Sequence, residues 1–358
     1  MEVILDIANI LEEILAGRRM NNEEFAYLYQ HADLLTLGQA ANQARGKRFP
    51  NNIATFIIDR NINYTNICSC QCKFCAFYRH ENDADAYVID KDTLFAKIEE
   101  AIELGASQLM IQGGLNPNLK IDFFEDMFQS IKQRYAITIH SLTAPEIAYI
   151  AQISDLDIKE TLLRLQKAGL DSLPGGGAEV LHDEVRKHIS PSKISTRQWL
   201  EVMRTAHEIG MKSTATMMMG SRDQLQHRIY HLDKIRNLQD GTGGFRAFIM
   251  WTYQPGNNEL MGKKISSLAY LRFLALSRLY LDNIDHIQGS WVTQGKQIGQ
   301  LSLLFGGDDL GSIMIEENVV RSAGLVYKMD REEMIELIRA TGRRPALRDT
   351  TYRILEEY

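Results

Sequence analysis

The four cysteines of the chain are its clearest sign of chemistry. They are Cys68, Cys70, Cys72 and Cys75, and they lie within eight residues of one another. Disulfide frameworks spread their cysteines along the chain so that each bond closes a loop, so a cluster this tight predicts a metal site in a reducing compartment. Cys68, Cys72 and Cys75 have the spacing C-x3-C-x2-C, and thiolates are soft ligands that suit zinc or an iron–sulfur cluster.

An iron–sulfur cluster fits this spacing better than zinc does. Structural zinc sites usually take four ligands from two well-separated pairs, and the sequence has no second cysteine pair. Cys70 lies two residues from both Cys68 and Cys72, a cramped geometry for one tetrahedral ion, so we interpret it as a non-ligand. Three cysteines on one loop can hold three irons of a cubane and leave the fourth iron open to an external ligand. A non-catalytic zinc or iron–sulfur protein is the alternative.

The elements that must position this loop alternate between strands and helices. A strand rich in β-branched residues is predicted at residues 53–62, directly before the cysteines. Further strands are predicted at residues 108–111, 136–140, 171–173, 212–219 and 245–251, with 286–291 and 301–305 as a seventh and an eighth. Helices are predicted at residues 90–104, 123–133, 196–209, 225–238 and 270–281, with two more within 144–168.

Alternating strands and helices predict an α/β fold with a parallel sheet covered by helices. We expect a (β/α) TIM-type barrel, full or partial, because polar residues and glycines follow most of the strands, where barrel active sites are built. A doubly wound open sheet is the alternative. We expect the barrel at residues 51–325, with an N-terminal helical segment at 1–50 and C-terminal helices at 326–358 packed on it. The expected terminal helices are residues 2–17, 22–45, 331–340 and 346–357.

Composition excludes several classes of protein. Of the 358 residues 45% are hydrophobic and 24% charged, so the chain can bury a large core. Its 40 Lys and Arg against 46 Asp and Glu give a net charge of −6, which disfavours a nucleic-acid-binding protein. No apolar run approaches the roughly 20 residues that span a bilayer, and no basic region precedes the first apolar residues. We therefore expect a cytoplasmic protein that acts on a small molecule.

The cysteine loop resembles that of the radical S-adenosylmethionine (radical SAM) superfamily. The resemblance rests on the C-x3-C-x2-C spacing after the first strand of a (β/α) chain, with Phe74 just before the last cysteine. It implies a [4Fe-4S] cluster held by Cys68, Cys72 and Cys75, with SAM chelating the open iron. It also implies a reducing partner, such as flavodoxin or ferredoxin, whose electron lets the cluster cleave SAM to a 5′-deoxyadenosyl radical.

Candidate cofactor-binding residues follow the predicted strands. The resemblance places Gln112, Gly113 and Gly114 as the stretch whose backbone holds the amino group of SAM, although Leu115 replaces the usual acidic residue. Three glycines before Glu179 would let a ligand approach the backbone closely, and this carboxylate could accept hydrogen bonds from ribose hydroxyls. A flexible loop with a solvated glutamate is the alternative there. The other cofactor-binding candidates are Phe74, Tyr78, Ser141, Gly176, Gly177, Thr216 and Met218.

Substrate-binding and catalytic candidates are less specific. Trp251 and Trp291 follow strands and together would suit an aromatic substrate, although core packing is the better explanation for each tryptophan taken singly. The substrate-binding candidates are Arg79, Arg246, Trp251, Gln254, Trp291 and Gln294. The catalytic candidates are His140, Glu179, Asp309, Glu316 and Glu317. A hydrogen-bonded structural histidine and solvated surface carboxylates are the alternatives for these groups.

Further stretches resemble one branch of the superfamily, the futalosine-pathway enzymes of menaquinone synthesis. They are residues 60–66, 75–79, 168–172, 174–179, 189–191, 199–207, 251–256, 290–294 and 316–320. Ser221 and Arg222 depart from the pattern of the branch, which puts a role for their loop in doubt. The resemblance implies an intramolecular cyclisation, in which a radical at ribose C4′ adds to an attached benzoate ring. The alternative within the superfamily is a sister enzyme that makes aminofutalosine or joins the rings of a deazaflavin cofactor.

Overall fold

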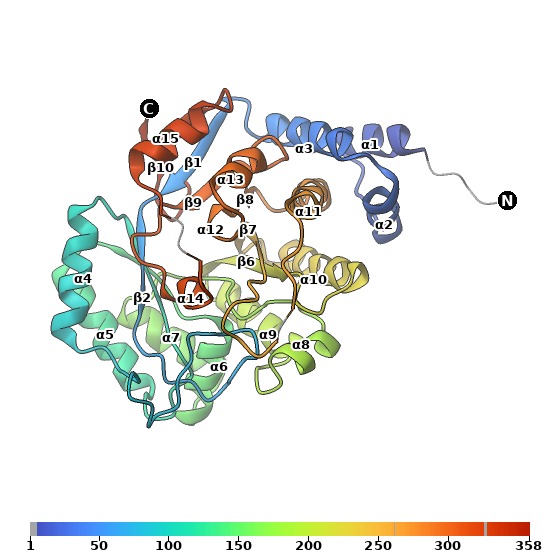
Figure 1. Ribbon diagram of the computed structural model, residues 1–358. Helices are drawn as coiled ribbons and strands as arrows, with labels where there is room; N and C mark the ends of the chain where they lie inside the picture. Colours follow the sequence, from blue (N-terminus) through green and yellow to red (C-terminus); the bar gives the residue numbers. More distant parts are fainter. Residues whose placement is uncertain (1–5, 261, 326–327) are drawn as a thin grey trace.

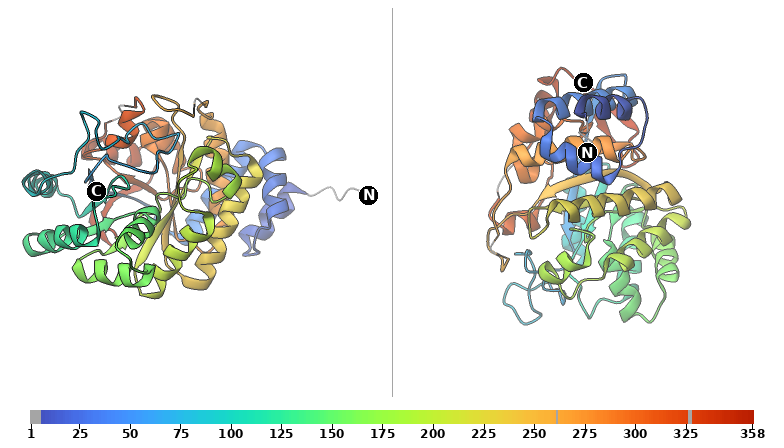
Figure 2. Two further views of the ribbon diagram at one scale, coloured as in Figure 1. Left: turned by 90° about the horizontal axis from the view of Figure 1, so that it is seen from below. Right: turned by 90° about the vertical axis from the view of Figure 1, so that its right-hand side faces the viewer.

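The computed structural model describes residues 6–260, 262–325 and 328–358 (Figure 1). A parallel sheet stands at its centre, and most of the helices are packed around the outside of that sheet (Figures 1 and 2). Within the described ranges, no helix has both the length and the apolar character that crossing a membrane requires.

The strands form a TIM-type barrel. Parallel neighbours follow one another in the order β2 (Asp59–Asn63), β3 (Gln108–Gln112), β4 (Thr138–Ser141), β5 (Ser172–Leu173), β6 (Lys212–Met219), β7 (Phe245–Thr252), β8 (His286–Gln288) and β9 (Asp309–Ser312). Strand β9 then pairs in parallel with β1 (Ile53–Ile57), which continues into β2 after Ile58. The order of strands therefore returns to the segment where it began, as a barrel requires and an open doubly wound sheet does not.

The helices around the barrel bury apolar side chains against their neighbours. They are α4 (Lys91–Glu103), α5 (Ile121–Arg134), α6 (Ala144–Ile153), α7 (Ile158–Ala168), α8 (Asp183–Ile189), α9 (Thr196–Glu208), α10 (Leu225–Thr242) and α11 (Ser267–Tyr280). Helix α9 is typical: Ser195 and Gln198 form a capping box at its start, and Trp199, Met203 and Ala206 face the core. The short helices α12 (Trp291–Gln294) and α13 (Lys296–Ser302) connect β8 to β9, and α14 (Asn318–Ser322) follows β9.

The N-terminal helices pack on one side of the barrel. They are α1 (Ile7–Leu15), α2 (Asn22–His31) and α3 (Leu34–Arg48), and the expected single helix at 22–45 is divided because Asp33 caps a new helix by accepting from the Thr36 N–H. Phe25 packs against Phe273 of α11 with ring centroids 5.3 Å apart. The segment therefore contacts the barrel through α11.

Three details of the predicted elements were wrong. The strand at 53–62 is divided into β1 and β2, and the strand at 301–305 does not exist, because residues to Ser302 belong to α13 and the eighth barrel strand is β9. Helix α15 (Arg331–Arg339) confirms the first C-terminal helix, but residues 346–357 fall in β10 (Arg344–Arg348) and β11 (Ile354–Glu357). Strand β10 pairs in parallel with the free edge of β1, so tertiary pairing overrides the local helical pattern there.

Candidate active site

A cavity of about 340 Å³ lies inside the barrel and reaches the cysteine loop. Its wall is built by residues from the C-terminal segment and from every barrel strand except β5, which contributes through the loop that follows it. Of the residues predicted from the sequence, it brings together Phe74, Cys75, Gln112, His140, Gly176, Thr216, Met218, Arg246, Trp251, Gln254, Trp291 and Glu317.

Strand β6 shows how alternation selects the lining residues. Thr214, Thr216 and Met218 line the cavity, whereas Met217 and Met219 point away and join the core between the sheet and the helices. The hydroxyl of Thr216 donates to the Gly175 carbonyl at 2.6 Å and so ties the strand to the glycine-rich loop. Of the three consecutive methionines, Met218 is therefore the one that lines the cavity.

The cysteine loop is fixed by backbone hydrogen bonds at both ends. The Cys68 N–H donates to the Arg79 carbonyl at 3.1 Å, and the Cys75 N–H donates to the Cys72 carbonyl at 2.9 Å. The Arg79 guanidinium donates to the Tyr78 carbonyl at 2.8 Å and pairs with Asp85 at 2.8 Å. Arg79 therefore shapes the loop and is not among the residues that line the cavity.

Two glycines after β3 allow this loop to approach the barrel. A Cβ on Gly114 would lie 2.2 Å from the Ile67 carbonyl oxygen, and one on Gly113 would lie 2.6 Å from the Tyr64 ring. The Gly113 N–H donates to the buried Glu146 carboxylate at 3.0 Å, which also accepts from the Tyr64 hydroxyl at 2.9 Å. Glycine is therefore required at both positions because the cysteine loop and Tyr64 lie so close. These two residues hold the cysteines against β3 and do not line the cavity.

The thiols present a donor set that fits an iron–sulfur cluster. All four are free; Cys68 and Cys75 are partly exposed, whereas Cys70 and Cys72 are buried with their sulfurs 3.6 Å apart. The hydrogen bond between Cys70 and Cys72 lowers the pKa of Cys72, and the Lys193 ammonium lowers it further. Burial raises the pKa of Cys68 and Cys75, so Cys72 is the one thiol of the motif whose surroundings favour the thiolate that binds iron. The three motif cysteines belong to one short loop beside the cavity, as a cluster with one open iron requires.

Beside the cysteines lies a buried charged group that the sequence revealed only in part. Glu179, with a backbone φ of +40°, is 5% exposed and accepts from the Lys193 ammonium at 3.1 Å. Its Oε2 atom has no hydrogen-bond partner among the described residues, although the Arg186 guanidinium lies 3.8 Å away. Lys193 also lies over the Phe74 ring at 5.3 Å. Burial alone would lower the pKa of Lys193, but Cys72 and Glu179 outweigh it and raise that pKa.

The three C-terminal acidic candidates have different environments. Asp309 is fully buried in an ion pair with Arg348 at 2.6 Å and accepts from the Thr55 hydroxyl, and it does not line the cavity. Glu316 pairs with Arg60 at 2.7 Å and Lys97 at 2.8 Å. Burial would raise the pKa of Glu316, but these cations hold it below its usual value. Both carboxylates are therefore paired with cations, and we interpret their role as structural.

Glu317 is the acidic candidate that lines the cavity. Its Oε1 accepts from the N–H groups of Val319 and Val320 at 2.8 and 2.9 Å, and its Oε2 accepts from the Asn61 amide at 3.0 Å. Burial raises the pKa of this carboxyl despite these donors. A carboxylate with a raised pKa that faces a cavity is a candidate proton acceptor.

The cavity is closed opposite the cysteines by positive charge. His140 receives or gives a 2.7 Å hydrogen bond with the Ser172 hydroxyl, and burial, together with Arg246 and Arg348, holds its pKa well below the usual value. Arg348 is paired with Asp309, but no carboxylate of the described residues forms an ion pair with Arg246, and its Nε and Nη2 atoms lack hydrogen-bond partners. Burial lowers the pKa of Arg246 to about 10, so it stays charged at neutral pH.

Several predicted residues lie outside the cavity. The Ser141 hydroxyl donates to the Ile111 carbonyl at 2.6 Å, the Tyr78 hydroxyl to Glu259 at 3.1 Å, and the Gln294 amide to the Thr252 hydroxyl at 2.5 Å. Gly177 has a φ of +77° and its carbonyl accepts from Arg186 at 3.2 Å. In this structure these residues support the wall and do not form its surface.

Sequence reasoning missed Lys193 and the residues that close the cavity from the C-terminal segment. These are Arg348, Thr350 and Tyr352. The ring of Tyr352 stacks on His286 with centroids 3.5 Å apart, and the Thr350 hydroxyl donates to Gln108 at 2.6 Å. Two β-forming segments around a polar turn at 349–353 were a usable signal, which the helical interpretation of 346–357 obscured.

Comparison with known proteins agrees with this geometry. The family model of the radical SAM superfamily matches residues 62–235, and that of the CofH/MqnC C-terminal region matches residues 242–357. The chain is 49% identical to cyclic dehypoxanthine futalosine synthase of Streptomyces coelicolor, covering 97% of this chain and 88% of the relative. It is 43% identical to the protein of the same name from Halalkalibacterium halodurans, covering 99% and 96%.

More distant relatives share the fold. Aminodeoxyfutalosine synthase of Thermus thermophilus is 37% identical, covering 96% of this chain and 94% of that protein. The crystal structure of methylornithine synthase (PylB) superposes with a TM-score of 0.75 at 18% identity, covering 94% of this chain and 97% of that one. At this identity the superposition supports the barrel alone.

Proposed function

Because this chain belongs to the radical SAM superfamily, we propose that it is the enzyme that cyclises dehypoxanthine futalosine in menaquinone biosynthesis. The observation that carries the proposal is the cavity, which connects the three-cysteine loop at one end to an unpaired guanidinium at the other, in a chain 49% identical to a synthase of that name. A substrate with a ribose and a benzoate has one end to be activated and one carboxylate to be bound, and the two ends of this cavity match those needs.

The family implies a [4Fe-4S] cluster and SAM, which when bound supply the 5′-deoxyadenosyl radical that takes hydrogen from ribose C4′ and so lets that carbon add to the benzoate ring. Cys68, Cys72 and Cys75 would hold the cluster. Lys193 and the free Oε2 of Glu179 are placed to bind the charged and hydroxyl groups of SAM beside it. A reducing partner, such as flavodoxin or ferredoxin, would supply the electron.

The rest of the cavity orients the substrate. Arg246 is placed to bind the benzoate carboxylate, because an unpaired buried cation is costly until an anion reaches it. Trp251 and Trp291 line the wall between this end and the cysteine loop and offer apolar surface to an aromatic ring. Restoring aromaticity after ring closure requires loss of one electron and one proton; the electron would pass to the oxidised cluster, and Glu317 would accept the proton.

Glu317→Gln is expected to lower kcat about 100-fold, the lower range for removal of a general base. The amide oxygen of the new side chain can still accept from Val319 and Val320, so the fold should persist. Because the pKa of Glu317 is raised and the carboxylate is the active form, wild-type kcat should increase with pH through that raised pKa. The pH profile of product formation measures this. Retention of the same acidic limb by the variant would assign the proton to another group.

The reaction itself is tested anaerobically. The cluster is reconstituted, reductant, SAM and dehypoxanthine futalosine are added, and products are followed by mass spectrometry. We expect 5′-deoxyadenosine together with a product two hydrogens lighter than the substrate. Deoxyadenosine without that product would point to a sister activity, such as that of the 37% identical aminodeoxyfutalosine synthase. If cluster-loaded protein formed neither product, the proposal would be overturned.

A further inference from the structure

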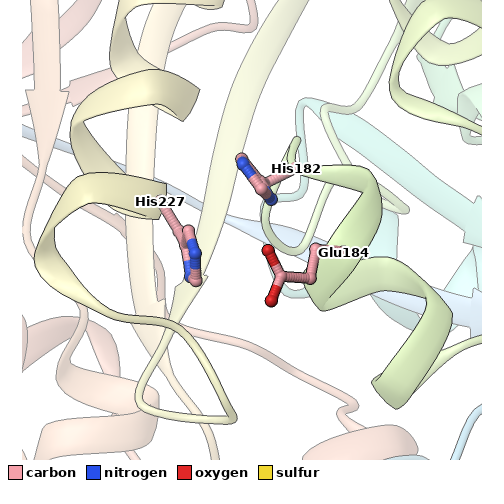
Figure 3. A group of neighbouring side chains, drawn as sticks. All are labelled: His182, Glu184 and His227. Carbon is pink, nitrogen blue, oxygen red and sulfur yellow. The ribbon is translucent and has the colours of Figure 1, made fainter.

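Outside the cavity, two histidines and a glutamate converge on one point between two helices. His182 precedes α8, Glu184 lies in its first turn, and His227 lies in the first turn of α10 (Figure 3). One ligand atom from each of the three lies within 4.8 Å of those of the other two. We propose that these side chains form a binding site for a divalent transition-metal ion, zinc by preference, that ties the loop after β5 to the start of α10.

The chemistry of the group matches zinc. Imidazole nitrogen and carboxylate oxygen are both common zinc ligands, and two histidines with one glutamate leave a fourth position for water. In the first-row series zinc also binds such ligands more tightly than manganese or iron(II). The carboxylate offsets the unfavourable approach of a cation to two helix N-termini.

The contacts of the side chains leave them ready for a ligand. The Nδ1 atom of His182 is buried and has no hydrogen-bond partner among the described residues. His182 and His227 face each other with ring centroids 4.4 Å apart. The exposed carboxylate of Glu184 has no hydrogen bond or ion pair within the described part of the chain and can rotate toward the rings. Two facing imidazoles of this kind leave a polar atom unsatisfied unless an ion or water joins them.

One contact must change on binding. The Gln224 N–H donates to Nδ1 of His227 at 3.2 Å, so this nitrogen is the hydrogen-bond acceptor of the ring. A metal ion bound at Nδ1 would replace this hydrogen bond directly. A metal ion bound at Nε2 would leave the ring proton on Nδ1, which could then no longer accept the hydrogen bond. The site is therefore expected to close around the ion rather than to be rigid beforehand.

The position of the site suggests what the ion would do. The Leu181 N–H, one residue before His182, donates to His231 of α10 at 2.9 Å. The Met218 N–H of β6 donates to the Glu179 carbonyl at 2.8 Å. An ion between His182, Glu184 and His227 would be a further connection between this loop and its neighbours, and it would hold the segment that carries Glu179. Its role would be structural.

Zinc binding by the cluster-loaded protein tests the proposal, since Cys68, Cys72 and Cys75 are then occupied by iron. After titration with zinc and desalting, elemental analysis should find about one zinc per chain in the wild type, with iron unchanged. His182→Gln and His227→Gln should lose that zinc, and Glu184→Gln, an exposed change that leaves the fold intact, should weaken binding about tenfold or more. His188→Gln is the matched control, because His188 is exposed on the same helix outside the group.

Thermal unfolding supplies a second readout that does not depend on activity. Zinc should raise the unfolding temperature of the wild type and of His188→Gln but not of His182→Gln or His227→Gln, because only a folded state that binds the ion is stabilised by it. The proposal would be overturned if both histidine variants retained as much zinc as the wild type, or if the wild type itself retained no zinc.

Discussion

Cys75→Ser is expected to abolish assembly of the iron–sulfur cluster and to reduce turnover to background. Serine is a hard oxygen ligand that does not replace a thiolate on iron, and the loop offers only three cysteines in the motif spacing. Cys75 is also the cysteine that lines the cavity, so its loss removes the cluster at the place where substrate and cofactor meet. Iron and sulfide content, measured after anaerobic reconstitution, should fall to a small fraction of the wild-type value.

Cys70→Ser is the matched control for that experiment. Cys70 is buried beside Cys72, and a serine hydroxyl there can still donate a hydrogen bond to the neighbouring thiolate. We expect full iron content and turnover within about twofold of the wild type, the range of a substitution that breaks no essential contact. Equal loss of iron in both variants would show that Cys70 is a ligand, and the reading of an open iron would then be wrong.

The barrel and the cysteine loop were predictable because their signals are local. Strand Lys212–Met219 and its alternation are present in eight consecutive residues, and the ligand spacing is complete within the loop. Strand β9 was not predictable in this way: its sequence Asp309-Leu310-Gly311-Ser312 resembles a turn, and only its pairing with β1 and β8 makes it a strand. Elements stabilised by distant partners leave little trace in their own sequence.

The three acidic candidates differ for a related physical reason. Asp309, Glu316 and Glu317 looked equivalent in the sequence, and their partners decide which of them faces the cavity. Arg348, which forms an ion pair with Asp309, is 39 residues away from it in the chain. Arg60, which forms an ion pair with Glu316, is 256 residues away. Glu317 is distinguished because its partners are neutral N–H groups, which allow its pKa to rise. No local pattern records such a difference.

Arg246→Met is expected to reduce kcat/KM for dehypoxanthine futalosine about 100-fold or more while leaving the protein at least as stable. Loss of one partner of a buried, hydrogen-bonded charge pair commonly costs binding of this order. In the absence of substrate the same guanidinium has no ion-pair partner within the described residues, and two of its nitrogens make no hydrogen bond. Replacing it with an apolar side chain of similar length removes a buried unpaired charge, so the unfolding temperature should stay the same or increase.

These opposite signs separate substrate binding from structural support. If Arg246 were structural, its variant would lose both stability and activity. If Arg246 binds the substrate, its variant should lose activity and keep its stability. The methyl ester of the substrate sharpens the test, because it lacks the negative charge. The wild type should strongly prefer the acid over the ester, and Arg246→Met should lose most of that preference, since the remaining cavity wall contributes through apolar contact. If the variant kept the full preference for the acid, the carboxylate would have to bind elsewhere, and the other cations near the cavity, Lys193 and Arg348, already have acidic partners in Glu179 and Asp309.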